Sequence, residues 1–223
     1  MAVRIRSARQ YGVGKRLFHL LILLWLACAG PALASERLIL ALGDSLTAGY
    51  QLPADASFPA QLQAALQKEG RQVRVHNAGV SGDTTAQGRA RLAWVLNSLK
   101  QKPDLAILAL GANDMLRGQK IVVTQANLDA ILAEFQRREI PVILAGMRAA
   151  PNLGQNYVQE YEAIFPALAK KYDASLYPFF LDGVAANPKL QLADGMHPNR
   201  AGVARMVNGI LPMVRSSLDR LPQ

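Results

Sequence analysis

Cysteine is nearly absent from this chain, because Cys28 is the only one among its 223 residues. That cysteine lies in an N-terminal segment, residues 1–34, which we expect to be removed. The remaining 189 residues then contain no thiol, which excludes disulfide bonds, a zinc–thiolate site and a cysteine nucleophile. Without cross-links, the remaining chain depends on a large apolar core for its stability, and its length is sufficient to bury one.

Acidic residues are absent from the first 34 positions, which nevertheless carry five arginine and lysine residues. A short apolar run, residues 20–29, follows the basic part, and Ala32-Leu33-Ala34 comes shortly after it. A basic part, an apolar part and an A-x-A motif in this order are typical of a secretory signal peptide, and we predict cleavage after Ala34. We therefore expect an exported protein, periplasmic or secreted.

Two alternatives to a cleaved signal peptide involve attachment to a membrane. An uncleaved anchor is disfavoured because the apolar run has about half of the ~20 residues that span a bilayer. A lipid attached to Cys28 is disfavoured because Trp25-Leu26-Ala27, the residues before it, do not form a convincing lipobox.

The basic character of the chain depends partly on the predicted signal peptide. The formal net charge of the whole chain is +9. Removing residues 1–34 takes away five basic residues and no acid, which lowers this charge to +4. The high isoelectric point is therefore weak evidence for a nucleic-acid partner, and we expect none.

Short apolar runs alternate with amphipathic stretches along the rest of the chain. Strands are expected at residues 37–42, 73–77, 104–110, 141–145 and 174–177. Helices are expected at residues 58–69, 84–99, 124–138, 157–172 and 201–218, the third capped by Thr124 and the last kinked at Pro212. This alternation predicts a three-layer α/β/α sandwich around a parallel sheet. No linker or repeat interrupts it, so residues 35–223 are expected to form one domain.

Polar segments follow the predicted strands. They are residues 43–50, 77–84 and 111–114, and a fourth such segment, residues 194–199, precedes the last predicted helix. The carboxyl ends of parallel strands share one edge of the sheet, where ligands bind. We therefore expect the first three segments to meet there, and a return of the fourth would complete a site.

Ser45 in the first segment is a candidate nucleophile, which requires a neighbouring base. Residues 35–223 contain two histidines, His76 and His197. His76 alternates with valines in a predicted strand and is expected to face a surface. His197 follows Asp194 by three residues, close enough for the carboxylate to orient the imidazole. Taken alone, Asp194 and His197 fit a surface turn before a helix better than a catalytic pair, because short motifs often match by accident.

Acyl transfer also requires hydrogen-bond donors for a developing oxyanion. The backbone N–H groups of Ser45 and Gly79 and the side-chain amide of Asn113 are candidates. Glycine allows close backbone approach. Each has an ordinary alternative, since Gly79 and Gly82 fit plain turns and Asn113-Asp114 fits a helix cap.

The four segments, in this order, resemble the four blocks of the SGNH (GDSL) hydrolase superfamily. The superfamily's Ser, Gly, Asn and His correspond to Ser45 in Gly-Asp-Ser-Leu, Gly79 in Asn-Ala-Gly-Val, Asn113 in Gly-Ala-Asn-Asp and His197 in Asp-Gly-Met-His-Pro. The longer strings are similar to those of the bacterial multifunctional arylesterase / acyl-CoA thioesterase I / lysophospholipase L1 group.

The resemblance implies a flavodoxin-like sheet of five parallel strands and a serine hydrolase that needs no metal or cofactor. It implies Ser45 as nucleophile, His197 as base and Asp194 as the residue that orients the base. The oxyanion donors it implies are Ser45, Gly79 and Asn113. Esters and thioesters of acyl chains would be hydrolysed through an acyl-enzyme. Asp44 is expected to support the turn that carries the nucleophile.

The resemblance also suggests an acyl-binding loop at residues 115–119. Leu116, Met147 and Pro151 lie on expected loops and could line an apolar acyl groove, although ordinary packing explains them equally well. Arg117 fits a contact with an anionic head group less well than a solvated surface position. The expected partner is a small acyl ester or thioester, with contact to a lysophospholipid as an option, and we expect a monomer.

Two other functions stay open at this point. A carbohydrate O-acetylesterase of the same superfamily would use the same residues on a shorter acyl group. A non-catalytic binding module would keep the fold without the chemistry, although every catalytic position is filled here. The sequence does not distinguish thioesterase, lysophospholipase and arylesterase activities, and export separates the protein from intracellular acyl-CoA.

Overall fold

The computed structural model describes residues 36–222. The predicted signal peptide and its cleavage site lie outside the described residues. Within residues 36–222, no helix combines the length and the apolar character needed to cross a membrane.

Five parallel strands form one sheet in the order β2-β1-β3-β4-β5. They are β1 (Arg37–Gly43), β2 (Val73–Gly79), β3 (Leu105–Ala109), β4 (Val142–Ala145) and β5 (Ser175–Tyr177). The chain adds β2 on one side of β1 and then builds the other strands outward from its other side. This reversal of strand order at β1 marks the place where open α/β sheets bind ligands.

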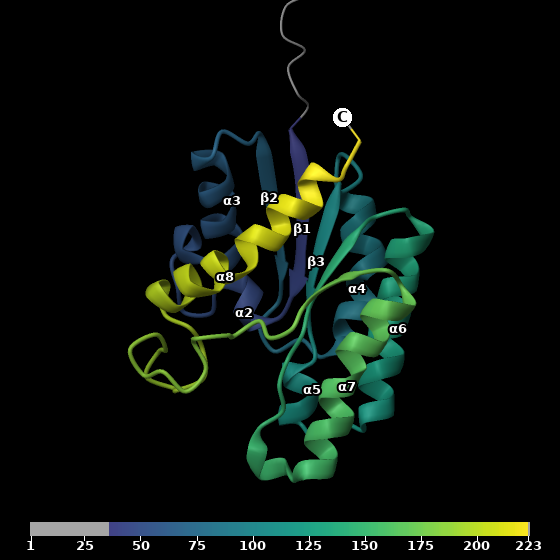
Figure 1. Cartoon of the computed structure of the whole chain (residues 1–223), viewed down its shortest axis with the longest axis vertical. Helices are drawn as coiled ribbons and strands as arrows, with labels where there is room; N and C mark the ends of the chain where they lie inside the picture. Colours follow the sequence, from purple (N-terminus) through teal and green to yellow (C-terminus); the bar gives the residue numbers. More distant parts are fainter. Residues whose placement is uncertain (1–35, 223) are drawn as a thin grey trace, which may run out of the picture. The chain divides into compact units, whose positions relative to one another are not determined.

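Helices cover both faces of the sheet, as Figure 1 shows. On one face, α3 (Phe58–Lys68) packs beside α8 (Arg200–Asp219). On the other face, α4 (Thr85–Ser98) packs against α6 (Ile121–Arg137), and α6 against α7 (Gln155–Lys171). The predicted three-layer sandwich with a flavodoxin-like sheet is confirmed.

The apolar patterns of the sequence explain these layers. All five residues of β3 are buried, as expected for a central strand with helices on both faces. In α6, one face of the helix is buried and carries Leu128, Ile131, Leu132 and Phe135. One apolar core therefore extends on both sides of the sheet, and its rigid strands hold the loops at their carboxyl ends.

The prediction that Thr124 caps a helix is wrong. Helix α6 begins at Ile121, one turn earlier, and Thr124 lies within it. Its side chain is buried, and its hydroxyl donates a hydrogen bond to Asp114 Oδ1 at 3.3 Å. A buried carboxylate from a distant segment thus uses the hydroxyl group that local sequence rules assign to a cap.

Two short helices were not expected from the sequence. They are α2 (Ser45–Ala48) and α5 (Ala112–Leu116), and each directly follows the end of a strand. Helices of four and five residues are too short to show the 3.6-residue periodicity that identifies longer ones. Both lie where the candidate site residues are found.

Candidate active site

Ser45 is the first residue of α2, immediately after β1 ends at Gly43. Asp44 caps the helix, because its Oδ1 accepts a hydrogen bond from the Leu46 N–H at 3.0 Å. Gly43 has no room for a side chain, since a Cβ atom would lie 2.1 Å from the Thr47 hydroxyl oxygen. The chain therefore turns sharply at the sheet edge and places Ser45 there. Asp44 supports this turn through its cap, which agrees with the expectation from the sequence.

Three side chains predicted to act together are in contact. His197 Nε2 lies 2.9 Å from Ser45 Oγ, and His197 Nδ1 lies 2.7 Å from Asp194 Oδ2. A serine, an imidazole and a carboxylate in this linear arrangement have the geometry of a hydrolase triad. The segment that carries His197 lies directly before α8 and reaches Ser45 at the sheet edge. An isolated antiparallel bridge between Gln191 and Pro198 joins the two ends of this segment.

The backbone of this segment keeps Asp194 ionised. The N–H groups of His197 and Met196 donate to Asp194 Oδ1 at 3.0 and 2.9 Å. These two hydrogen bonds, followed by that of the His197 side chain, lower the pKa of Asp194 to about 2. An anion at this position favours the imidazole tautomer that carries its proton on Nδ1, so that Nε2 can accept the Ser45 proton.

His76, the other histidine of the described chain, lies within β2 opposite Leu40 of β1. Burial and the neighbouring charge of Arg74 lower the pKa of His76. It does not line the cavity beside Ser45. The geometry thus separates the two histidines as the sequence predicted.

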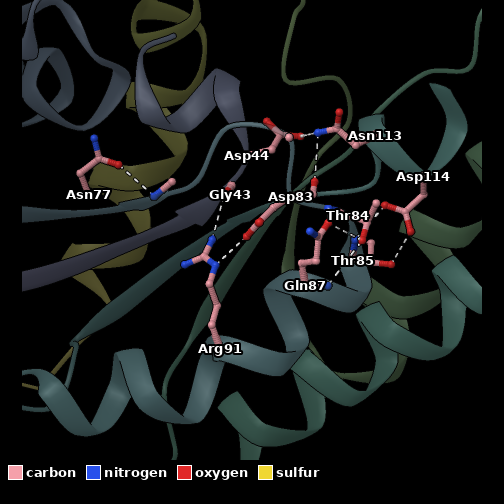
Figure 2. A network of polar contacts seen from close by, with 12 residues as sticks. Gly43, Asp44, Asn77, Asp83, Thr84, Thr85, Gln87, Arg91, Asn113 and Asp114 are labelled. Atoms are coloured by element: carbon pink, nitrogen blue, oxygen red, sulfur yellow. Dashed lines mark hydrogen bonds and ion pairs between the residues drawn. The ribbon is translucent and has the colours of Figure 1, made fainter. Parts of the chain in front are cut away.

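Asn113 reaches the site from α5, whose N-cap residue is Gly111. The alternative that Asn113-Asp114 caps a helix is therefore wrong. Figure 2 shows the Asn113 amide donating to the backbone oxygen of Asp83 at 3.0 Å, with a longer contact of 3.4 Å to Asp44 Oδ2. The contact to Asp44 Oδ2 is longer than an ordinary N–H···O hydrogen bond, so this amide N–H is held only weakly and a ligand oxygen could compete for it.

Asp114, which lies on α5 itself, fixes this helix to α4 and α6. Its buried carboxylate accepts hydrogen bonds from the Thr85 N–H at 2.8 Å and from the Thr85 hydroxyl at 2.5 Å. The Thr124 hydroxyl is a third donor. Because these donors come from α4 and α6, Asp114 fixes the position of Asn113 relative to both helices.

The structure corrects the prediction that Gly79 donates to the oxyanion. The Gly79 N–H already donates to Asn77 Oδ1 at 3.0 Å, and Gly79 does not line the cavity. A Cβ atom on Gly79 would lie 2.3 Å from the backbone nitrogen of Ala48. The glycine therefore lets β2 pack against α2 and is required for packing.

Gly82, three residues later, lines the cavity in place of Gly79. Its φ of +86° lies in the left-handed region that favours glycine. Its carbonyl accepts a hydrogen bond from Arg117 Nη2 at 2.7 Å, whereas no acceptor for its N–H is found within residues 36–222. In the sequence, Gly82 is visible only as a turn glycine two residues before Thr84, the N-cap of α4. This pattern does not show which backbone N–H faces the site.

Asp44 is the most deeply buried carboxylate beside Ser45, with 1% of its surface exposed. Burial is the main cause that raises the pKa of Asp44, to about 6, and the charge of Asp83 acts in the same direction. The Leu46 N–H and the charge of His197 act in the opposite direction. A carboxyl group that titrates near neutrality thus lies within the turn of the nucleophile.

A cavity of about 660 Å³ opens beside Ser45, His197 and Asn113. The predicted groove residues Leu116, Met147 and Pro151 all line it. Its other apolar lining residues include Leu46, Tyr50, Met115, Phe179, Leu181 and Met196. This lining suits an apolar chain of several carbons, with the ester carbon held beside Ser45.

Tyr50 and Arg148 line the cavity and were not predicted as site residues from the sequence. The Tyr50 ring lies 4.4 Å from the His197 ring between centroids and covers one side of the imidazole. Arg148 lines the cavity, and its guanidinium lies 5.1 Å from the centroid of the Phe179 ring. Arg117 does not line the cavity itself and donates to the carbonyl of Gly82, so the arginine that lines the cavity is Arg148.

Comparison with known proteins gives consistent results. The model of the GDSL-like Lipase/Acylhydrolase family matches residues 41–205. A protein of Vibrio mimicus named arylesterase is 38% identical over 182 residues, which are 82% of this chain and 90% of that protein. An Escherichia coli K12 protein named thioesterase 1/protease 1/lysophospholipase L1 is 38% identical over 183 residues, 82% of this chain and 85% of its own.

A solved structure shares the fold as well. The crystal structure of AlinE4, described as an SGNH-hydrolase family esterase, has a TM-score of 0.71 and 50% sequence identity. The match covers 84% of this chain and 99% of AlinE4. The similarity therefore extends over both of the segments that carry Ser45 and His197.

Proposed function

Because the chain belongs to the GDSL-like Lipase/Acylhydrolase family and is a carboxylic ester hydrolase, we propose that it is an exported serine esterase that acts on acyl esters and thioesters. The proposed triad is Ser45, His197 and Asp194. The observation that carries this proposal is the contact of His197 with both partners, at 2.9 Å to Ser45 and 2.7 Å to Asp194.

In the first half of the proposed reaction, Ser45 Oγ attacks the carbonyl carbon of the substrate and its proton moves to His197 Nε2. The carbonyl oxygen becomes an oxyanion. The N–H groups of Ser45 and Gly82 and the amide of Asn113 are the proposed donors to it, because all three residues line the cavity. His197 then gives its proton to the leaving alcohol or thiol as the bond to the carbonyl carbon breaks.

In the second half, water attacks the acyl-enzyme formed on Ser45. His197 accepts a proton from this water and returns one to Ser45 Oγ as the carboxylic acid leaves. The Asp194 anion stabilises the imidazolium in both halves, and its pKa of about 2 keeps it charged under ordinary conditions. The proposed mechanism uses only protein groups and water.

The size and lining of the cavity favour an acyl chain over an acetyl group. We expect kcat/KM for p-nitrophenyl esters to rise about 10- to 100-fold from acetyl to octanoyl, since each CH2 buried in an apolar site contributes up to about 0.8 kcal/mol. Leu116→Ser, a change at the exposed mouth of the cavity, should reduce the octanoyl rate selectively. Steady-state kinetics with both esters measure this preference.

Trp94→Ser is the matched control, because Trp94 is 73% exposed on α4 and does not line the cavity. It should leave the preference unchanged. Hydrolysis of acetyl esters with none of octanoyl esters would contradict the acyl-chain proposal and favour the carbohydrate O-acetylesterase. Lysophospholipids and acyl thioesters in the same assay would rank the arylesterase, thioesterase and lysophospholipase activities.

Export is the part of the proposal that rests on sequence alone. Residues 1–34 combine five basic residues, a short apolar run and Ala32-Leu33-Ala34. We expect the protein collected outside the cytoplasm of an expressing bacterium to begin at Ser35, as read by N-terminal sequencing. A protein that keeps residues 1–34 would contradict cleavage and favour the alternative of an uncleaved membrane anchor.

A further inference from the structure

We propose that Arg91 is a positioning residue for the hydrolysis, which joins the turn of the nucleophile to the loop that carries the oxyanion donors. The inference rests on the proposed function of Ser45, Gly82 and Asn113. Arg91 lies on α4, away from the cavity lining, and nothing in its own stretch of sequence connects it to the reaction.

The guanidinium of Arg91 bridges two segments, as Figure 2 shows. Its Nε donates to Asp83 Oδ2 at 2.6 Å, and its Nη2 donates to the carbonyl oxygen of Gly43 at 3.0 Å. Only 19% of the Arg91 side chain and 8% of the Asp83 side chain are exposed. This ion pair is therefore screened much less by solvent than the surface pairs of the protein.

Each end of the bridge lies next to a group of the proposed mechanism. Gly43 is the last residue of β1, two positions before Ser45. Asp83 directly follows Gly82, and its backbone oxygen accepts the hydrogen bond of the Asn113 amide at 3.0 Å. One guanidinium thus sets the distance between the nucleophile and two of its three proposed oxyanion donors.

An arginine suits this role better than a lysine. Its planar fork donates in two fixed directions, here to a carboxylate and to a carbonyl, whereas an ammonium group acts as a single point charge. Errors of about 1 Å in such positions cost up to about 100-fold in rate. Because Arg91 does not touch the cavity, its loss should lower kcat and leave KM nearly unchanged.

Arg91 also balances charge near the buried Asp44 carboxyl. Besides burial, the groups that act on Asp44 are the Leu46 N–H of its own turn, His197 before α8 and the Asp83 anion on the loop before α4. The charge of Asp44 in turn raises the pKa of Tyr161 on α7. Arg91 on α4 is the ion-pair partner of Asp83. Without this cation, the unbalanced Asp83 anion would raise the pKa of Asp44 above its value of about 6. Because the Asp44 carboxylate caps the helix that begins at Ser45, its protonation weakens the turn of the nucleophile, and the acidic limb of the pH profile would move to higher pH.

The test compares Arg91→Met with Arg89→Met. Arg89 is exposed on the same helix, and its guanidinium contacts Asn127 of α6; neither residue lines the cavity or contacts the segments that Arg91 joins. We expect Arg91→Met to lower kcat about 10- to 100-fold with KM within about twofold, and to shift the acidic limb of kcat/KM upward. Arg89→Met should do neither. Asn113→Ala removes a proposed oxyanion donor itself and should lower kcat by about 100- to 1,000-fold. This loss is the largest that displacement of the donor alone could cause.

Both the selective loss of kcat and the pH shift are required. Any other result for a folded Arg91→Met variant, including equal changes in kcat and KM, overturns the proposal. If this variant does not fold, Arg91→Lys is tested instead, because lysine keeps the positive charge beside Asp83 but not the two fixed donor directions. A kcat at least about threefold lower at unchanged KM supports the positioning role. An unchanged kcat overturns it.

Ser45→Ala in the same assay separates this inference from the proposed function. If Ser45→Ala retains hydrolysis, the proposed nucleophile is wrong. If Ser45→Ala is inactive while Arg91→Met behaves like Arg89→Met, only the positioning role fails.

Discussion

Ser45→Ala lowers kcat/KM for p-nitrophenyl esters by about 10⁴-fold or more and abolishes labelling by a fluorophosphonate. The magnitude follows from losses measured when the nucleophile of other serine hydrolases is removed. The hydroxyl is the group that His197 Nε2 contacts at 2.9 Å, and the change to alanine removes only this one oxygen atom. Kinetics on purified protein and mass spectrometry of the labelled adduct measure both effects.

Ser98→Ala is a matched control for this experiment. The Ser98 hydroxyl donates to the Val95 carbonyl at the end of α4, away from the cavity, so its loss should leave activity and labelling unchanged. Labelling that persists in Ser45→Ala would refute the nucleophile. A wild-type protein that binds acyl esters without hydrolysing them would favour the non-catalytic binding module.

His197→Ala lowers kcat/KM by an amount similar to that of Ser45→Ala, about 10⁴-fold, because members of a triad act as one unit. The imidazole is the only base in contact with Ser45 Oγ in the described part of the chain. Its loss leaves a serine hydroxyl that cannot pass on its proton during the attack. Steady-state kinetics and the rate of fluorophosphonate labelling should fall together.

His76→Ala serves as the matched histidine control. His76 lies within β2 and does not line the cavity, so activity within about twofold of wild type is expected, as for surface positions away from a site. Loss of activity in a folded His76→Ala variant would contradict the choice of base. The double variant Ser45→Ala/His197→Ala should be no less active than either of these single variants, because the two residues act as one unit.

The sequence by itself was sufficient to predict the sheet and to propose the three residues of the triad, whose side chains the structure brings into contact. The strands are visible as short apolar runs because central parallel strands are buried on both faces, which removes polar residues from them. Ser45 could be predicted because a polar segment directly after a strand lies at the sheet edge. His197 was predicted instead from Asp194, three residues before it, and from the resemblance to the SGNH hydrolases. The cavity residues Leu116, Met147 and Pro151 were found in the same way, from their expected positions in loops.

The sequence could not show which glycine lines the cavity and is the proposed oxyanion donor. Gly79 and Gly82 stand three residues apart in one turn-rich segment, and both fit a close backbone approach. The direction of a backbone N–H depends on the dihedral angles of its neighbours, which no residue pattern specifies there. In the folded protein, Asn77 occupies the Gly79 N–H, and Gly82 with a φ of +86° lines the cavity.

The fold alone decided which distant groups support the site. Arg91 and Gly43 are 48 residues apart, and Thr85 and Asp114 are 29 apart, yet both pairs form hydrogen bonds. Such pairs depend on how α4 and α6 pack against the sheet, so they leave no periodic signal in the chain. The sequence therefore determined Ser45, His197 as its proposed base and the edge of the sheet where they meet, because local patterns carry that information. Only tertiary packing determined where Gly82 and Arg91 lie, because their proposed roles depend on neighbours that are remote in sequence.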